Sequence, residues 1–266
     1  MTFQPVLPLG GFAGWSFLQR TLDTQQETFN QGGLIARETA YFRENIASVQ
    51  TAEDLVNDRQ LLKVALGAYG LEDDINNRAF IQQILEGGTD EPDALANRLT
   101  DVRYRQFSDA FGFGNFTGSR TPVPAFAEQV IEDYQTRQFE VAVGNQDTSL
   151  RLALGLERDL GEIASGTLSV DSKWFAVMGN PPLRQVFETA LALPPAFGTV
   201  DLEQQLEVFK ERAQSAFGTD DIADFADAEV QDELVRRFFA LDQINTGFQT
   251  QTGASAALTL LQGALR

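Results

Sequence analysis

Apolar side chains recur every three or four residues along most of this chain, and this spacing constrains the fold more than any other feature. The clearest case is a stripe that would lie along one side of an α-helix, formed by Val230, Leu234, Val235, Phe238 and Leu241. The strict alternation of apolar and polar residues that marks a half-buried β-strand is nearly absent. The sequence therefore predicts an all-α fold, a multi-helix bundle composed of two related helical halves.

Start and stop signals place the ends of these helices. Asp201 is predicted to be an N-cap with Gln204 completing a capping box, and Gly218 to end the same helix in the left-handed conformation. Asn180 before Pro181 predicts another helix start, because proline is tolerated in a first turn. With a break expected near Ala226, the predicted helices cover residues 14–30, 33–47, 52–69, 74–86, 91–99, 101–111, 124–143, 148–164, 169–178, 181–193, 201–217, 220–243 and 254–264.

Two stretches of the chain resemble each other in the same order. A Phe-Gly pair that ends a predicted helix occurs at residues 111–112 and again at residues 217–218. The other matched pairs are Leu95 with Leu202, Leu99 with Leu206, Arg137 with Arg237, and Phe139 with Phe239. The main change in spacing falls in the glycine-rich connector at residues 112–124, where a shorter second copy costs little loop entropy. This pattern favours an internal duplication, and the alternative is two amphipathic segments that resemble each other by periodicity alone.

The predicted organisation follows from these elements. We expect an N-terminal segment with the first helix over residues 1–32, a first helical half over 33–165 and a second helical half over 166–266. A single compact domain is the alternative, because 266 residues lie near the upper size for one hydrophobic core.

Histidine and cysteine do not occur anywhere in the sequence. Most general-base catalysis, most soluble metal sites and all thiol chemistry draw on these two residue types. We therefore expect no catalytic, cofactor-binding or metal-ligating residues, and the sequence argues against an enzyme.

The chain is strongly acidic, with 20 Lys and Arg against 38 Asp and Glu, for a formal net charge of −18. A charge of this size repels phosphate backbones and anionic lipid headgroups, which disfavours binding to nucleic acid or to membrane surfaces. No stretch is long and apolar enough for membrane insertion, and the segment from Met1 to Trp15 lacks the features of a signal peptide. These patterns favour the cytoplasm.

Acidic residues gather in two places. Asp220, Asp224 and Asp227 are spaced to lie near one face of a helix, where carboxylates can bind calcium or magnesium. The spacing is not that of an EF-hand loop, so we favour helix capping and interaction with the helix dipole. Residues 72–74 form the second cluster, for which charge at a helix start is again sufficient.

The least regular stretch is the connector at residues 112–124, which is too rich in glycine and proline to be helical. It carries Phe113 and Phe116, which would form a docking patch if both were exposed. We favour the alternative, in which both phenylalanines fold back onto the core.

Several blocks of sequence resemble a known family, in the right order along the chain. They are Ala36–Ile46, Glu53–Asp58, Ala68–Asp73, Leu95–Leu99 and Leu150–Leu154. Together they resemble a mainly alphaproteobacterial family filed as domain of unknown function number 1217. The resemblance implies an all-helical protein whose gene often lies beside flagellar genes, and it brings no assigned catalytic or metal residue. The chain departs from the family pattern at Asp74–Asn77.

These observations favour a non-enzymatic protein-interaction or assembly factor. Its expected partner is a protein, with a flagellar component implied by the family resemblance, bound through an apolar stripe on an acidic helical body. The alternative is an acidic metal-binding module or a carboxylate-based metal-dependent hydrolase centred on Asp220, Asp224 and Asp227. The alternative to the cytoplasm is export by the flagellar route, which is independent of a signal peptide.

Overall fold

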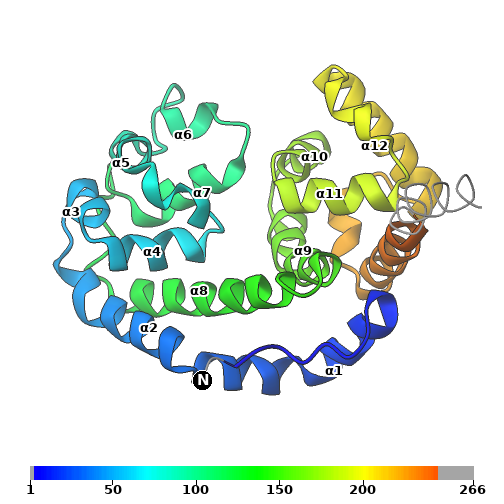
Figure 1. Cartoon of the computed structure of the whole chain (residues 1–266). Helices are drawn as coiled ribbons and strands as arrows, with labels where there is room; N and C mark the ends of the chain where they lie inside the picture. Colours follow the sequence, from blue (N-terminus) through cyan, green and yellow to red (C-terminus); the bar gives the residue numbers. More distant parts are fainter. Residues whose placement is uncertain (1–2, 245–266) are drawn as a thin grey trace, which may run out of the picture. The chain divides into compact units, whose positions relative to one another are not determined.

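The computed structural model describes residues 3–244, and the regular structure within this range is entirely helical, with no strand (Figure 1). The predicted all-α fold class is confirmed. The predicted helix at residues 254–264 lies outside the described residues. Within this range the chain divides into two compact units, unit 1 from residues 3–7 and 17–151, and unit 2 from residues 8–16 and 152–244. This division falls at residues 151 and 152, whereas the sequence halves were expected to meet at residues 165 and 166.

Unit 1 is built around α4, which packs against α2, α3 and α8 (Figure 1). Its helices are α1 (Gly11–Asn30) from residue 17 onward, α2 (Gly33–Asn45), α3 (Ala52–Asn57), α4 (Arg59–Ala68), α5 (Arg78–Gly87), α6 (Leu95–Arg98), α7 (Val102–Phe111) and α8 (Pro124–Gly144), with two 3-10 helices, η1 (Ile46–Ser48) and η2 (Glu72–Asn76).

Helix α4 is almost wholly apolar between Leu61 and Ala68, and seven of its residues are buried. A close contact with α8 explains why residue 67 of α4 is a glycine. A Cβ atom on Gly67 would lie 2.7 Å from the Cε2 atom of Tyr134, whose side chain is fully buried. The hydroxyl of Tyr134 donates to Glu38 on α2, so one tyrosine joins the three central helices of unit 1. Burial and this hydrogen bond raise the pKa of Tyr134, which therefore keeps its proton.

Unit 2 has an aromatic core. The rings of Trp174 and Phe187 meet edge to face at 5.4 Å between centroids, and Phe187 makes a similar contact with Phe225. The helices of this unit are residues 11–16 of α1, α9 (Thr148–Ser165) from residue 152 onward, α10 (Val170–Met178), α11 (Pro181–Ala190), α12 (Leu202–Phe217) and a helix over residues 228–244, with two 3-10 helices, η3 (Pro195–Thr199) and η4 (Ile222–Ala226).

Several predicted helix ends are confirmed. Asn180 caps α11 by accepting a hydrogen bond from the Leu183 amide at 3.2 Å, with Pro181 in the first turn. Gly218 ends α12 in the left-handed conformation at φ 76°. The predicted break near Ala226 separates η4 from the helix over residues 228–244.

Other predicted helices are shorter or divided. The helix predicted over residues 52–69 is two helices, because Asp58 takes an extended conformation and caps α4. The region predicted as 74–86 begins with the 3-10 helix η2, and α5 starts at Arg78. Only Leu95–Arg98 is helical within the predicted 91–99. The helix predicted over 181–193 ends at Ala190, before Ala192 with φ 54°.

The capping box predicted at the start of α12 is wrong in its second half. Asp201 is the N-cap, and its carboxylate accepts from the Glu203 amide at 3.0 Å. Gln205, rather than Gln204, binds back to the preceding turn by donating to the carbonyl oxygen of Val200. Gln205 is buried while Gln204 is exposed, so the amide that reaches back is the one facing the core.

Helices α4 and α11 have matching ends, each within its own unit. Asp58 caps α4 with its side chain as Asn180 caps α11. At the other end, Arg137 donates its Nε–H to the carbonyl oxygen of Ala68 at 2.7 Å. Arg237 donates in the same way to Ala190 at 2.6 Å. Both helices then turn through a left-handed residue, which is Gly70 at φ 67° after α4 and Ala192 at φ 54° after α11.

Candidate functional site

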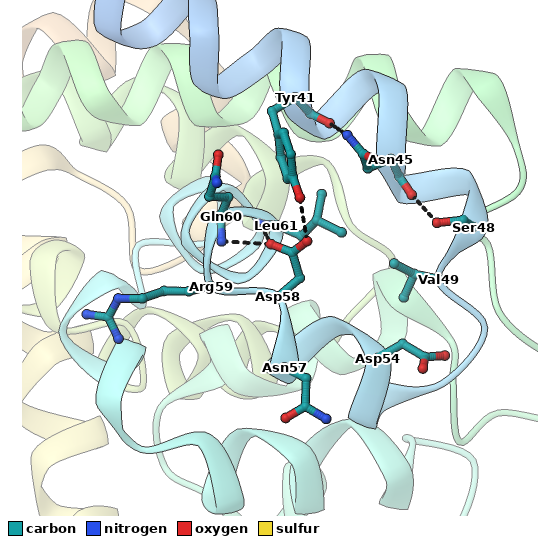
Figure 2. Close-up of a pocket in the computed structure, with 10 residues that line it drawn as sticks. All are labelled: Tyr41, Asn45, Ser48, Val49, Asp54, Asn57, Asp58, Arg59, Gln60 and Leu61. Atoms are coloured by element: carbon teal, nitrogen blue, oxygen red, sulfur yellow. Dashed lines mark hydrogen bonds between the residues drawn. The ribbon is translucent and has the colours of Figure 1, made fainter.

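A polar hollow of about 630 Å³ lies in unit 1 where α2, α3 and α4 meet (Figure 2). Tyr41 on α2 points toward Asp58, and its hydroxyl donates to the Oδ2 atom of Asp58 at 2.7 Å. The Oδ1 atom of the same carboxylate accepts from the amides of Gln60 and Leu61 at 2.9 and 3.0 Å. Asp58 is thus held by the first turn of α4 and by Tyr41 together.

Hydrogen bonds hold Tyr41, Asp54 and Asp58 in this hollow. The hydrogen bond to Asp58 is the main cause of a raised pKa at Tyr41, because a phenolate would face the carboxylate. Hydrogen bonds from the side chain and amide of Thr51 lower the pKa of Asp54, which stays ionised as part of a capping box. Tyr41 keeps its proton and both carboxylates serve as caps, so the arrangement orders helix starts.

The predicted acidic cluster is not gathered on one helix face. The chain forms η4 and then a separate helix, so Asp220, Asp224 and Asp227 belong to three different local structures. The backbone oxygen of Asp220 accepts from the indole of Trp174 at 2.7 Å. The carboxylate of Asp224 accepts from the Thr219 hydroxyl. Asp227 accepts from the Glu229 amide at 2.8 Å, which is an N-cap bond. Among residues 3–244, no three acidic side chains are grouped as ligands for a metal ion.

The second acidic cluster lies in η2 of unit 1. Asp74 accepts from the hydroxyl of Tyr104 at 2.6 Å and from the side-chain amide of Asn77 at 2.6 Å. Burial of the phenol and the hydrogen bond to Asp74 raise the pKa of Tyr104 to about 12. Glu72 lies 3.6 Å from the guanidinium of Arg151. These acidic side chains therefore connect η2 to α7 and to residue 151.

The connector at residues 112–124 separates its two phenylalanines. Phe113 packs against the core and stacks on Phe111 at 5.9 Å between ring centroids, as the sequence predicted. The prediction is wrong for Phe116, which is 87% exposed. Phe116 is the most exposed of the large apolar side chains in the part of the chain that the structure describes.

The backbone around Phe116 is held by hydrogen bonds from a distant segment. The Phe116 amide donates to the Oδ2 atom of Asp90 at 2.6 Å. The Oδ1 atom of Asn115 accepts from the Thr89 amide at 2.7 Å. Gly114 passes so close to this segment that a Cβ atom there would lie 2.4 Å from the carbonyl oxygen of Glu86. An exposed aromatic ring therefore stands on a loop whose backbone is fixed at several points.

Comparison with known proteins places the chain in a family. The sequence model of a family described as "Protein of unknown function (DUF1217)" matches residues 68–230. The chain belongs to the DUF1217 family. The family predicted from the sequence blocks is therefore confirmed.

A solved structure supports the same placement and the helical fold of this DUF1217 protein. The crystal structure of a protein from Agrobacterium tumefaciens, a structural genomics target, superposes with a TM-score of 0.74. It shares 27% sequence identity, and the match covers 91% of this chain and 99% of the other. No curated protein matches the chain.

Sequence reasoning missed both the hollow at Tyr41 and Asp58 and the exposure of Phe116. A usable signal existed for the first, because the Asn57-Asp58 dipeptide stands directly before a second apolar run, and both residue types favour N-caps. The exposure of Phe116 depends on hydrogen bonds between the loop and residues Thr89 and Asp90, and no local sequence pattern predicts these bonds.

Among residues 3–244, none of the helices combines the length and apolar character needed to cross a bilayer.

Proposed function

We propose that this DUF1217 protein is a non-enzymatic interaction or assembly factor that binds a protein partner through Phe116. The observation that carries the proposal is the 87% exposure of this residue on a hydrogen-bonded loop. Aromatic anchors of this kind contribute much of the binding energy in protein interfaces. Burial of a phenylalanine side chain contributes roughly 1.5–3 kcal/mol, and an already ordered loop loses little further entropy on binding.

The state of the ionisable groups supports a role without catalysis. Tyr41 and Tyr104 have raised pKa values and donate to carboxylates, so neither is prepared to act as a base or nucleophile near neutral pH. Asp58 and Asp227 accept hydrogen bonds from amides at helix starts. Helix capping accounts for these side chains without a substrate.

The partner we propose is a flagellar component, and this part of the proposal rests on the family resemblance. The acidic character of the chain, with a net charge of −18, favours a partner surface that carries lysine and arginine beside its apolar contacts. We place the protein in the cytoplasm, with export by the flagellar route as the alternative.

An internal duplication also belongs to this proposal. The matched pair Arg137 and Arg237, noted in the sequence, occupies equivalent positions relative to the ends of α4 and α11. Two left-handed glycines, Gly112 and Gly218, end α7 and α12 after a phenylalanine in each case. Shared hydrogen bonds at two separate places support common descent of the two segments more strongly than shared periodicity does.

Co-purification from native cells under gentle conditions tests the proposed function. We compare the unaltered protein with Phe116→Ala, and Leu168→Ala serves as a control because Leu168 is a large apolar residue that is 52% exposed in unit 2. We expect a flagellar component to be enriched with the unaltered protein and with Leu168→Ala, and to be lost with Phe116→Ala. Equal recovery with all three proteins, or recovery of no flagellar component, would contradict the proposal.

A further inference from the structure

Unit 2 has an open groove of about 760 Å³ between α10 and α12. The two helices are joined beneath it by the rings of Trp174 and Phe209, whose centroids lie 5.6 Å apart. Because both rings are fully buried, the groove is a surface feature over a packed core. Its apolar lining comes from Phe175 on α10 and from Leu206 and Val208 on α12.

Other exposed apolar residues lie on α10 and near the start of α12. Phe175 is 38% exposed, Leu202 is 48% exposed, and Val200 just before the helix is 37% exposed. Leu202 and Leu206 are four residues apart on α12, so they lie on the same side of that helix. Isolated exposed apolar residues are ordinary, and of the three exposed residues only Phe175 belongs to the lining of the groove.

The charged residues of the groove are all of one sign. Asp171, Glu203 and Glu207 belong to its lining, and the lining residues include no lysine or arginine. Lys210 lies nearby and donates to Asp171 at 2.9 Å, and this hydrogen bond raises the pKa of Lys210. Glu203 and Glu207 are four residues apart, so they present two carboxylates on one side of α12.

We propose that the α10–α12 groove binds an amphipathic segment of a partner protein that carries lysine or arginine beside apolar anchors. The inference rests on the proposed role as an interaction factor and names the chemistry of a partner for a second surface. The negative charge of the groove favours a basic partner segment over a second copy of this chain, because a second copy would bring another net charge of −18 to the same carboxylates. An anionic lipid surface is disfavoured for the same reason.

Titration with a synthetic peptide tests the groove. The probe is an amphipathic helix of leucine and lysine, and its counterpart carries glutamate in place of lysine. We follow the backbone amide resonances of the full chain by NMR. The lysine peptide is expected to shift resonances in α10 and α12, and the glutamate peptide is expected to shift none. Failure of the lysine peptide to bind, or shifts confined to other helices, would overturn the inference.

Charge variants distinguish specific binding in the groove from general electrostatic attraction to an acidic protein. Glu203→Lys with Glu207→Lys is expected to raise the Kd of the lysine peptide about tenfold or more. The matched control reverses two exposed carboxylates of unit 1, Glu44 and Glu132, and is expected to change the Kd less than about twofold. Equal weakening by both pairs would show unspecific attraction and overturn the inference. Glu203→Gln with Glu207→Gln gives a smaller loss that confirms the trend if the lysine variant folds poorly.

Two further arms separate the remaining outcomes. Vesicles of anionic phospholipid are expected to leave the resonances of α10 and α12 unshifted. Shifts with vesicles but not with the peptide would mean that the groove binds a membrane surface and not a protein, which would overturn the inference. Phe116→Ala is expected to leave peptide binding unchanged, because Phe116 is not one of the residues that line the groove. Loss of groove binding together with intact capture through Phe116 therefore overturns this inference alone and leaves the proposed function standing.

Discussion

Helices α7 and α12 end in the same way but lead into segments with opposite surroundings. Each ends with Phe-Gly, and the amide of the left-handed glycine donates to the carbonyl oxygen four residues earlier at 3.0 Å. After Gly112 the chain presents Phe116 to solvent. After Gly218 the chain enters η4 and buries Phe225 completely between Phe187 and Phe217.

The difference shows where apolar side chains serve folding and where they are free for binding. In unit 2 the segment after the cap is short, and its aromatic residue completes the core. In unit 1 the longer connector contributes Phe113 to the core and keeps Phe116 outside. An aromatic residue that the core does not need, on a backbone held by Asp90, is the feature we assign to partner binding.

The largest expected effect comes from removing the two aromatic rings in turn. Phe225→Ala leaves a cavity in a closed core and should lower the free energy of unfolding by roughly 3–5 kcal/mol. Phe116→Ala should change it by less than about 0.5 kcal/mol, since its ring contacts solvent. Urea unfolding followed by far-UV circular dichroism checks both, and tryptophan fluorescence adds a report on unit 2, because Trp15 and Trp174 both belong to it. Comparable losses in the free energy of unfolding for the two variants would contradict the different roles assigned to the two rings.

The two capping glycines should respond differently to the same substitution. Gly218→Ala should cost about 1–2 kcal/mol, the penalty of the left-handed conformation alone, since nothing lies within 4 Å of the added Cβ. Gly112→Ala places its Cβ 2.6 Å from the carbonyl oxygen of Gly118, which should add about 1–3 kcal/mol of steric strain. Urea unfolding followed by far-UV circular dichroism measures both. Equal costs would mean that the connector moves aside freely.

A smaller effect is expected from the side chains that fix each segment. Asn115→Ala removes the acceptor of the Thr89 amide and should cost about 1 kcal/mol in unit 1. Thr219→Ala removes the hydroxyl bound to Asp224 and should cost a similar amount in unit 2. Only Asn115→Ala should weaken capture of the partner, because it loosens the loop that presents Phe116. Hydrogen exchange at the Thr89 amide and co-purification together check this. Unchanged capture of the partner by Asn115→Ala would show that order in the Phe116 loop does not contribute to binding.

The smallest expected effect concerns the matching ends of α4 and α11. Ala192 occupies the left-handed position that Gly70 occupies after α4. Ala192→Gly should therefore raise the free energy of unfolding by about 0.5–1 kcal/mol, since glycine adopts this conformation without steric cost. Tryptophan fluorescence during urea unfolding measures the gain in unit 2. A loss of stability would mean that the methyl group of Ala192 contributes packing that the comparison with Gly70 overlooks.

Most of the helices were predictable because local signals agree with the final packing. For α8 and α12, periodicity and end residues all point to one helix. The break at Asp58 was missed because apolar positions continue across it, with Val56 before and Leu61 after, both buried. There the N-cap preference of Asp58 prevails over the continuous pattern.

The sites were less predictable because they depend on contacts between distant parts of the sequence. Grouping Asp220, Asp224 and Asp227 on one face assumed an unbroken helix, which the turn into η4 removes. The exposure of Phe116 depends on Asp90, which is 26 residues away along the chain. The local sequence shows that an aromatic residue is present, but tertiary hydrogen bonds determine whether its side chain faces the core or solvent.

Photo-crosslinking from position 116 tests the central claim most directly. The photoreactive residue p-benzoylphenylalanine replaces Phe116 in one strain and Leu168 in another, and adducts formed in living cells are identified by mass spectrometry. The account predicts a discrete adduct with one partner from position 116 and none with that partner from position 168. An absence of adducts at position 116, or the same set of adducts from both positions, would contradict it.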